Sequence, residues 1–375
     1  MTASAGSGLP KDDAKQGGHI AAGYRSAIEG AAVVDRSDRR YVIVSGRAPA
    51  RMLAGLFSGS LPPDLGEPSA SGRRGRMPYS ALLTPKGKIV ADLRIARLGN
   101  GEEGPFLIEL PSAGYKAALE RMQQYLPPRF ARLEEPGEPI GLLTVIGPRA
   151  PELLKAAIME LPDPRLSLAE LDEGEEVVLE GAAAVPTRIV RTGDVTPPAW
   201  DVIAPLPVVH GVQERLGALD AVIAPFELWE TLRIERGRPA FGLELDEDVL
   251  PPEAGIEDRA IDYRKGCFTG QEFIVRIRDR GKVNRHLRGA LLGDATPPAF
   301  GTSLFLPDRE APVGETRSAV RSPRFGQSIV LAYVRREIEP PTHLRLGTRE
   351  GPEAKLRTID LNGWVLVEGD AAPIA

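Results

Sequence analysis

Two segments that lie far apart in the chain share one pattern, and this pattern constrains the fold more than any other feature. Each begins with an apolar run typical of a buried strand, passes through a glycine and ends with apolar residues at helical spacing. The two segments are YVIVSGRAPARMLAGL (41–56) and LLTVIGPRAPELLKAAI (142–158). Because internal similarity is typical of repeated units, we predict two similar α+β units within one chain.

The residues around these segments predict further strands and helices. YSALLTPKGKIVADLRIARL (79–98) contains two apolar runs joined by a T-P-K-G turn, which predicts a β-hairpin. FLIEL (106–110) predicts a third strand, and 113–126 has apolar residues at helical spacing. The stretch 59–78 is rich in glycine, proline and serine and predicts a long loop. Strands are also expected in 175–193, and mainly helix in 211–237.

The two ends of the chain differ from this α+β body. The N-terminus is small and polar without periodicity, so we expect a flexible tail over 1–30. From about residue 287 onward, short apolar runs alternate with glycine and proline, which predicts a small antiparallel β-barrel over 287–375. The body would then span 31–286, with its two units at about 31–140 and 141–286.

Charge and cysteine content exclude several classes of protein. The net charge of -5 gives no general attraction to nucleic acid or to an anionic membrane. No stretch approaches the roughly 20 apolar residues of a membrane span. The chain has one cysteine and four histidines without metal-ligand spacing, so it cannot hold a four-cysteine cluster by itself. We expect a cytoplasmic monomer with no permanently bound metal and no nucleic-acid or membrane partner.

The single cysteine lies in KGCFTGQEF (265–273). Thr269 and the glutamate three residues later fit a capping box, which predicts a helix over 270–280 that stops at Gly281. Alternating apolar residues leave a strand open as well. If the helix forms, its dipole and Lys265 favour the thiolate form of Cys267. The other interpretation is a buried, inert cysteine between glycines that shape a turn.

The same stretch resembles a known family. K-G-C-F-T-G-Q-E (265–272) is similar to the signature K-G-C-[YF]-x-G-Q-E of the YgfZ family. These folate-binding proteins are associated with iron–sulfur cluster assembly or repair, and they are relatives of the glycine-cleavage aminomethyltransferase. The run LRIERGRPAFGLELDEDVLPPEAG (232–255) is similar to a second part of that family. The resemblance implies an α+β, aminomethyltransferase-like ring of two related units with a central folate pocket, followed by a small C-terminal antiparallel β-barrel.

The resemblance also implies a cofactor, partners and site residues. The cofactor would be tetrahydrofolate or a derivative, and the partners would be iron–sulfur client or assembly proteins. The expected catalytic residues are Cys267, Lys265 and Asp92. The expected cofactor-binding residues are Arg233, Trp229, Gly266, Gly270, Gln271, Glu272 and Arg276. The residues alone allow plainer roles: Arg233 in a structural ion pair with a neighbouring glutamate, Trp229 in the core and Asp92 facing solvent.

Departures from the aminomethyltransferase pattern limit the activity that we expect. Only one carboxylate remains in Ala91-Asp92-Leu93, the asparagine of the next strand is missing, and the glutamate that pairs with the pterin ring falls on Pro197. The leading hypothesis is a folate-binding accessory protein for iron–sulfur cluster assembly or repair. The alternative is a folate-dependent one-carbon enzyme, such as an aminomethyl or methyl transferase or a demethylase, with Asp92 as its acid/base group. A folate sensor without chemistry is the third.

Overall fold

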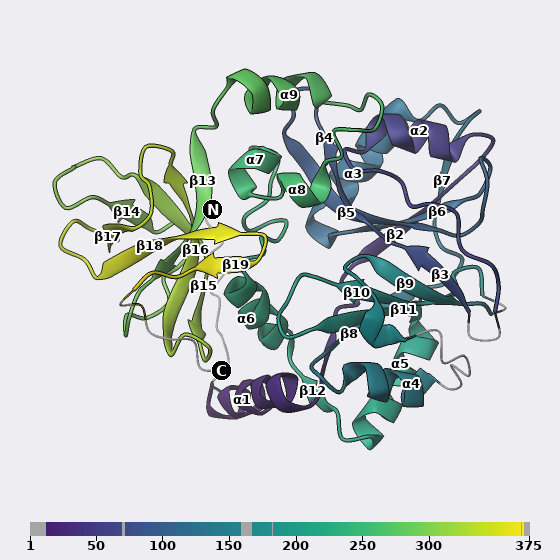
Figure 1. The fold of residues 1–375 in the computed structure, drawn as a ribbon, viewed down its shortest axis with the longest axis horizontal. Helices are drawn as coiled ribbons and strands as arrows, with labels where there is room; N and C mark the ends of the chain where they lie inside the picture. The colour runs from purple at the N-terminus through teal and green to yellow at the C-terminus, as the bar shows by residue number, and fades with distance from the viewer. Residues whose placement is uncertain (1–12, 70–71, 159–166, 182, 369, 371–375) are drawn as a thin grey trace, which may run out of the picture.

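A computed structural model describes the chain except for residues 1–12, 70–71, 159–166, 182, 369 and 371–375, and three sheets organise it (Figure 1). The first body sheet has the order β12 (Val222–Ala224), β1 (Ala32–Asp35), β8 (Ile140–Ile146), β11 (Ala199–Pro205), β10 (Thr187–Thr192), β9 (Glu175–Leu179), β3 (Arg73–Arg76). The second has the order β4 (Tyr79–Leu83), β5 (Ile89–Arg97), β6 (Phe106–Leu110), β2 (Arg40–Ser45), β7 (Arg132–Glu134). Their pairings are antiparallel except that β12 runs parallel to β1.

The two body sheets pack face to face, and helices cover their outer faces. Helices α4 (Ala150–Ile158) and α5 (Leu206–Ala218) share a core with the first sheet, and η1 (Leu168–Glu170) joins it. Helices α2 (Pro49–Leu56) and α3 (Ser112–Tyr125) share another core with the second sheet. A third core joins the two sheets, with Leu107 from β6 and Ile203 from β11. The body therefore has four layers, and central strands such as β8 and β11 are buried on both faces, whereas the edge strands β3, β7 and β12 are partly exposed.

Strand alternation explains why β8 is apolar along its whole length. Leu142 points into the core between the sheets, while its neighbour Leu143 points toward α4 and α5. Successive side chains of a strand lie on opposite faces, so a strand between two packed layers needs apolar residues at nearly every position.

The repeated sequence pattern has the same local structure at both places. Strand β2 leads through Gly46 to α2, and β8 leads through Gly147 to α4. Both glycines have positive φ, of 134° and 127° respectively, and a β-carbon at either would clash with backbone atoms. The two strand–glycine–helix predictions are thus confirmed, whereas a ring of two related units stays a prediction.

The C-terminal part forms one all-antiparallel sheet. Its order is β13 (Arg285–Leu291), β16 (Gln327–Arg335), β15 (Gly314–Ser322), β14 (Ser303–Phe305), β17 (Thr342–Leu346), β18 (Glu353–Asp360), β19 (Gly363–Val365). Strand β13 also pairs with β18. The antiparallel prediction is confirmed at this level, and the term barrel and the domain limits stay predictions.

Four helices lie between the body and the C-terminal sheet. They are α6 (Phe226–Arg236), α7 (Pro251–Ala254), α8 (Glu257–Ala260) and α9 (Gln271–Arg280). Helix α6 contacts β1 on one side and β15, β16 and β19 on the other. In Figure 1 it lies at the junction of the two halves, so its side chains reach both.

Two expectations about irregular segments are wrong. Helix α1 (Asp13–Glu29) occupies much of the expected tail of 1–30; residues 1–12 lie outside the described part. The helix is held by packing, since Gly23 lies against Ala224 and Leu228 and the Tyr24 hydroxyl donates to Glu235 at 2.9 Å. The expected loop of 59–78 contains β3, the edge strand paired with β9. Within the described residues, no helix is both long and apolar enough to cross a membrane.

Candidate functional site

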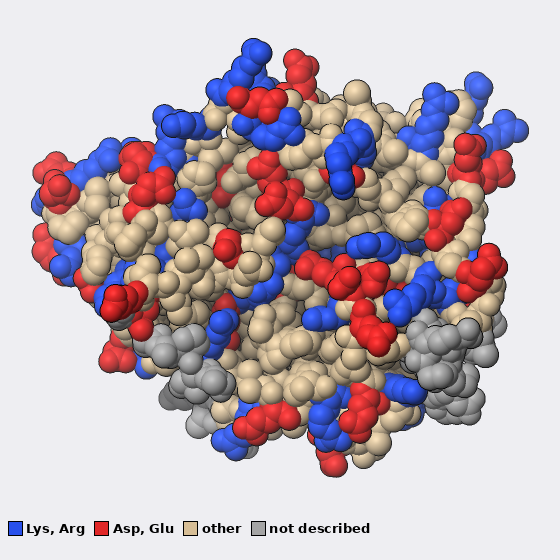
Figure 2. All heavy atoms as spheres, in the orientation of Figure 1, with Lys and Arg blue, Asp and Glu red and all other residues tan. Residues whose placement is uncertain are grey.

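A cavity of about 430 Å³ lies between the two body sheets and helices α6 and α8. Figure 2 shows charged side chains of both signs gathered around the hollow between the body and the C-terminal sheet. The residues that line the cavity include Arg36, Arg39, Tyr79, Asp92, Arg94, Glu109, Asp194, Phe226, Trp229, Glu230, Arg233, Arg238, Phe241 and Arg259. A concave site of this size with a few converging polar groups suits a small organic ligand.

Of the two carboxylates in this cavity that form no ion pair with a described arginine, Asp38 is exposed and Asp92 is buried. Asp92 lies in the middle of β5 and is 8% exposed, and its Oδ1 atom has no hydrogen-bond partner among the described residues. Burial raises the pKa of Asp92, although the charge of Arg39 and the nearby Tyr79 hydroxyl act to lower it. A buried carboxyl group with a raised pKa and a bare oxygen is suited to exchange a proton with a bound ligand. The expectation that Asp92 belongs to a site is therefore consistent with its position.

Most of the arginines in the cavity are committed to carboxylates. Arg94 from β5 donates to Glu109 at 2.6 Å and to Asp201 at 2.6 Å, which joins the two body sheets. Asp201 also accepts from Thr144 at 2.7 Å, so it is not free to bind a pterin. The Arg94 guanidinium and its neighbour Arg39 hold the pKa of Glu109 below its usual value although burial acts to raise it. This network stabilises the floor of the cavity.

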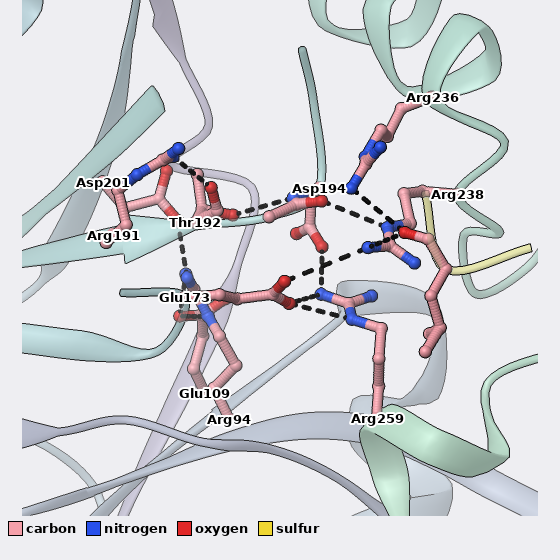
Figure 3. A network of polar contacts seen from close by, with 12 residues as sticks. Arg94, Glu109, Glu173, Arg191, Thr192, Asp194, Asp201, Arg236, Arg238 and Arg259 are labelled. Atoms are coloured by element: carbon pink, nitrogen blue, oxygen red, sulfur yellow. Dashed lines mark hydrogen bonds and ion pairs between the residues drawn. The ribbon is translucent and has the colours of Figure 1, made fainter. Parts of the chain in front are cut away.

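A second network lies where the cavity faces α8 (Figure 3). Arg259 from α8 donates to Glu173 at 2.6 Å and to Asp194 at 2.9 Å. Arg259 thereby holds the pKa of Asp194 well below its usual range, against the effect of burial. Burial lowers the pKa of Arg238 to about 10, and that guanidinium donates to the backbone oxygens of Gly193 and Leu361. These contacts tie the C-terminal sheet to the body.

Arg233 has the structural role that its sequence left open. Its side chain is fully buried and donates to Glu230 at 2.7 Å, to Glu244 at 3.1 Å and to Ser318 at 2.6 Å. It touches the cavity, but its hydrogen-bonding capacity is already used within the protein. That Arg233 binds the cofactor therefore stays a prediction. The structure does not favour it, because every N–H group of the guanidinium already donates within the protein.

Trp229 and Arg36 form a stacked pair on another wall of the cavity. The guanidinium carbon of Arg36 lies 3.5 Å from the centroid of a Trp229 ring, and Phe226 stacks against Trp229 at 5.6 Å. Within the described part of the chain, the Nε1 atom of Trp229 has no hydrogen-bond partner, and neither has Nε of Arg36. Trp229 was expected at the site from its sequence. Arg36 was not, because a single arginine after a short apolar strand carries no distinctive signal.

Cys267 lies outside this cavity. It is exposed to solvent in a groove of about 700 Å³ that is lined by residues of α2, the segment around Ser60, Glu102, Lys265 and Gly266. The two cavities share no lining residue. The interpretation of Cys267 as a buried small hydrophobe is wrong, because the loop 265–267 lies on the surface against α2.

The residues around Cys267 differ in part from expectation. The Lys265 ammonium donates to the carbonyl oxygens of Phe57 and Gly59, the latter at 2.8 Å, and burial lowers its pKa to about 8. Helix α9 is confirmed, but its N-cap is Gly270 and no side chain caps it, so the capping box of Thr269 is wrong. Gly270 has a φ of 84° because it lies against the Thr84 carbonyl of the hairpin turn, where a β-carbon would clash.

The other motif residues also lie away from the cavity. Gln271, Glu272 and Arg276 are on α9, whose buried residue Ile274 packs on the hairpin. A β-carbon on Gly266 would meet open space. Among the predicted cofactor-binding residues, only Trp229 and Arg233 line the cavity, whereas Gly266 lines the Cys267 groove. A third pocket shares Tyr79 and Arg259 with the cavity and Ser60 and Leu61 with the groove.

Comparison with known proteins places this geometry in a family. The GCVT N-terminal domain family matches residues 12–265, which is more than half of the chain. This chain belongs to that aminomethyltransferase-like family. A probable aminomethyltransferase of Haloarcula marismortui is 30% identical over 294 residues, which cover 76% of this chain and 76% of the relative. An aminomethyltransferase of Streptomyces coelicolor is 26% identical over 348 residues, which cover 90% of this chain and 84% of the relative.

A relative of known structure has the same fold as this chain. The crystal structure of the glycine cleavage system aminomethyltransferase T of Bartonella henselae superposes with a TM-score of 0.72. The match covers 92% of this chain and 91% of that chain at 17% sequence identity. The aminomethyltransferase-like fold expected from the sequence is thus confirmed.

Proposed function

We propose that this protein binds a tetrahydrofolate in the central cavity and acts as an accessory factor for the assembly or repair of iron–sulfur proteins. Membership of the aminomethyltransferase-like family supports the folate, and the KGCFTGQE motif supports the accessory role. Its partners would be folate and iron–sulfur client or assembly proteins, and its place of action the cytoplasm, as a monomer.

The buried polar groups of the cavity fit such a ligand. Asp92, Trp229 and Arg36 line the cavity, and each has a buried polar atom without a hydrogen-bond partner among the described residues. Buried polar groups in proteins are nearly always satisfied, so these three call for a ligand that offers both donors and acceptors around a flat ring. Reduced folates have this composition. When bound, a tetrahydrofolate would supply a nitrogen that carries one-carbon groups, and Asp92 is the residue that could exchange a proton with it.

The observation that carries the accessory role is the exposure of Cys267. Inert cysteines are among the most buried residues, whereas this one lies on the surface, outside the cavity. An exposed thiol can reach a second protein, and Cys267 is not among the residues that line the central cavity. The two sites are therefore suited to different tasks: the cavity to folate and the Cys267 groove to a partner.

The alternative is a folate-dependent one-carbon enzyme, and Asp92 favours it. The raised pKa and bare Oδ1 atom of this residue suit an acid/base role at the ligand. Classical aminomethyl transfer is not proposed. Pro197 occupies the place of the pterin glutamate, and Asp201, at the end of the same motif, is bound to Arg94.

Two substitutions separate these functions. In a strain without the protein, Cys267→Ala should fail to restore the activity of iron–sulfur enzymes, while purified Cys267→Ala should bind tetrahydrofolate as the wild type does. Arg264→Ala, the exposed neighbour outside the motif, is the control and should restore activity. If Cys267→Ala restores full activity, the accessory role of the thiol is refuted. The enzyme hypothesis instead predicts tetrahydrofolate-dependent demethylation of a methylated amine that Asp92→Asn abolishes and Cys267→Ala leaves intact.

A further inference from the structure

Arg36 differs from every other arginine that lines the central cavity. Six arginines line it, and five of them form ion pairs with a carboxylate. Arg36 forms none with any described residue and makes no side-chain hydrogen bond with them, although it is only 7% exposed. Burying a guanidinium without an ion-pair partner costs folding free energy, and proteins rarely keep such a group unless a ligand supplies the partner.

The stack on Trp229 fixes the orientation of this cation without satisfying it. The 3.5 Å separation places the flat guanidinium over the ring, and Phe226 backs the same ring. A cation over an indole face is stabilised by the ring electrons, but this contact satisfies none of its N–H groups, and the Arg36 side chain makes no hydrogen bond to a described residue. The wall therefore holds a guanidinium whose position is fixed by the stack and whose donors are unused among the described residues.

We infer that Arg36 and Trp229 form a binding site for one carboxylate group of the cavity's ligand. A guanidinium edge matches a carboxylate with two parallel hydrogen bonds, which an ammonium cannot reproduce. A single guanidinium that is within electrostatic reach of Asp38, Asp194 and Asp201 but ion-paired with no described residue suits a monoanion better than a phosphate, because the other five arginines of the cavity are paired with carboxylates. This inference rests on the proposed function for the identity of the ligand.

The carboxylate has two chemical sources in a folate-dependent protein. It belongs either to the glutamate tail of the folate or to a small amino acid whose amine carries the one-carbon group. Two matched pairs of probes distinguish these sources: 5-formyltetrahydrofolate against 6-methyltetrahydropterin, which lacks the tail, and sarcosine against methylamine, which lacks the carboxylate.

The variant to test is Arg36→Met, with Arg191→Met as its matched control. Arg191 also stacks on a tryptophan, with its guanidinium carbon 4.7 Å from the centroid of the Trp200 ring. It forms no ion pair with a described residue, and it is not among the residues that line the cavity. Binding is measured by calorimetry and by the shift in melting temperature on adding each probe. Arg36→Met should fold and melt no lower than the wild type, because it removes an unpaired buried charge. If it does not fold, Arg36→Gln takes its place.

The expected result is that Arg36→Met weakens the probe with a carboxylate by about 10- to 100-fold and leaves its partner probe unchanged. Loss confined to the folate identifies the tail, and loss confined to sarcosine identifies the amino acid. Arg191→Met should bind all four probes as the wild type does. If Arg36→Met binds both carboxylate probes with wild-type affinity, the inference is overturned and the proposed function stands. If wild-type protein binds no folate, the proposed function fails, and only the sarcosine arm can still support Arg36.

Discussion

Replacing Arg233 by methionine should destabilise the protein severely and change folate binding little. Arg233 and Glu244 are both fully buried, and their ion pair spans 3.1 Å between helix α6 and the loop after it. The guanidinium also donates to Ser318 on β15 and to the backbone oxygen of Arg238 at 3.0 Å. Removing the cation would leave the Glu244 charge buried without a counter-ion. Breaking a buried pair on one side costs about 3–5 kcal/mol, a large part of the stability of a typical domain.

The assay is urea unfolding of the wild type, Arg233→Met, Glu244→Gln and the double variant. The double variant should be more stable than Arg233→Met alone, because the stranded carboxylate is gone, and the coupling free energy should exceed about 1 kcal/mol. Folate affinity is measured on the folded fraction of each. The reasoning would be refuted if Arg233→Met lost less than about 1 kcal/mol while its folate affinity fell at least about tenfold. Arg233 would then be a ligand-binding residue, as its sequence first suggested.

Two further changes test the Cys267 loop and the start of α9. Burial lowers the pKa of Lys265 from 10.5 to about 8, so between these pH values the unfolded chain binds the extra proton. The difference in unfolding free energy between the wild type and Lys265→Met should therefore rise as the pH increases from about 8 toward 10.5, and it should be lowest below pH 8. If this difference in unfolding free energy stays constant from about pH 7 to about pH 10, the reasoning is contradicted. Gly270→Ala should cost about 1–3 kcal/mol, because φ is 84° and its β-carbon would lie 2.6 Å from the Thr84 oxygen, whereas Gly266→Ala meets open space and should unfold as the wild type does. Equal unfolding midpoints for the two alanine variants would contradict this expectation and would show that the hairpin turn at Thr84 can shift to accommodate the β-carbon.

Local patterns predicted much of the body because local and tertiary preferences agree there. The hairpin of 79–98 became β4 and β5, the strand of 106–110 is β6, and the helix of 113–126 is α3 (Ser112–Tyr125). In each, the apolar period of the sequence matches the face that is buried in the fold. Helix α1 was missed because its small and polar residues show no period, and its stability comes from contacts with Ala224 and Leu228, which lie far away in sequence.

The site was harder to predict because its properties depend on pairing. Arg36 and Arg233 are the same residue type, yet one has no ion-pair partner among the described residues and the other has several. Whether an arginine forms an ion pair depends on the three-dimensional positions of glutamates such as Glu230 and Glu244. Sequence spacing alone does not predict those positions. Motif resemblance located Asp92 and Trp229 at the cavity, but it could not show that Cys267 lies in a different groove.

The C-terminal sheet supplies none of the described residues that line the central cavity, yet it holds the helix that does. Ser318 and the backbone at Leu361 accept hydrogen bonds from Arg233 and Arg238, which both face the cavity. The residues that would contact a ligand thus come from the body, whereas contacts with the C-terminal sheet hold two of the arginines of the cavity wall in place. We therefore expect substitutions in loops of the sheet away from these two contacts to leave ligand binding unchanged. A substitution of Ser318 should alter ligand binding indirectly, because it removes a hydrogen-bond acceptor of Arg233.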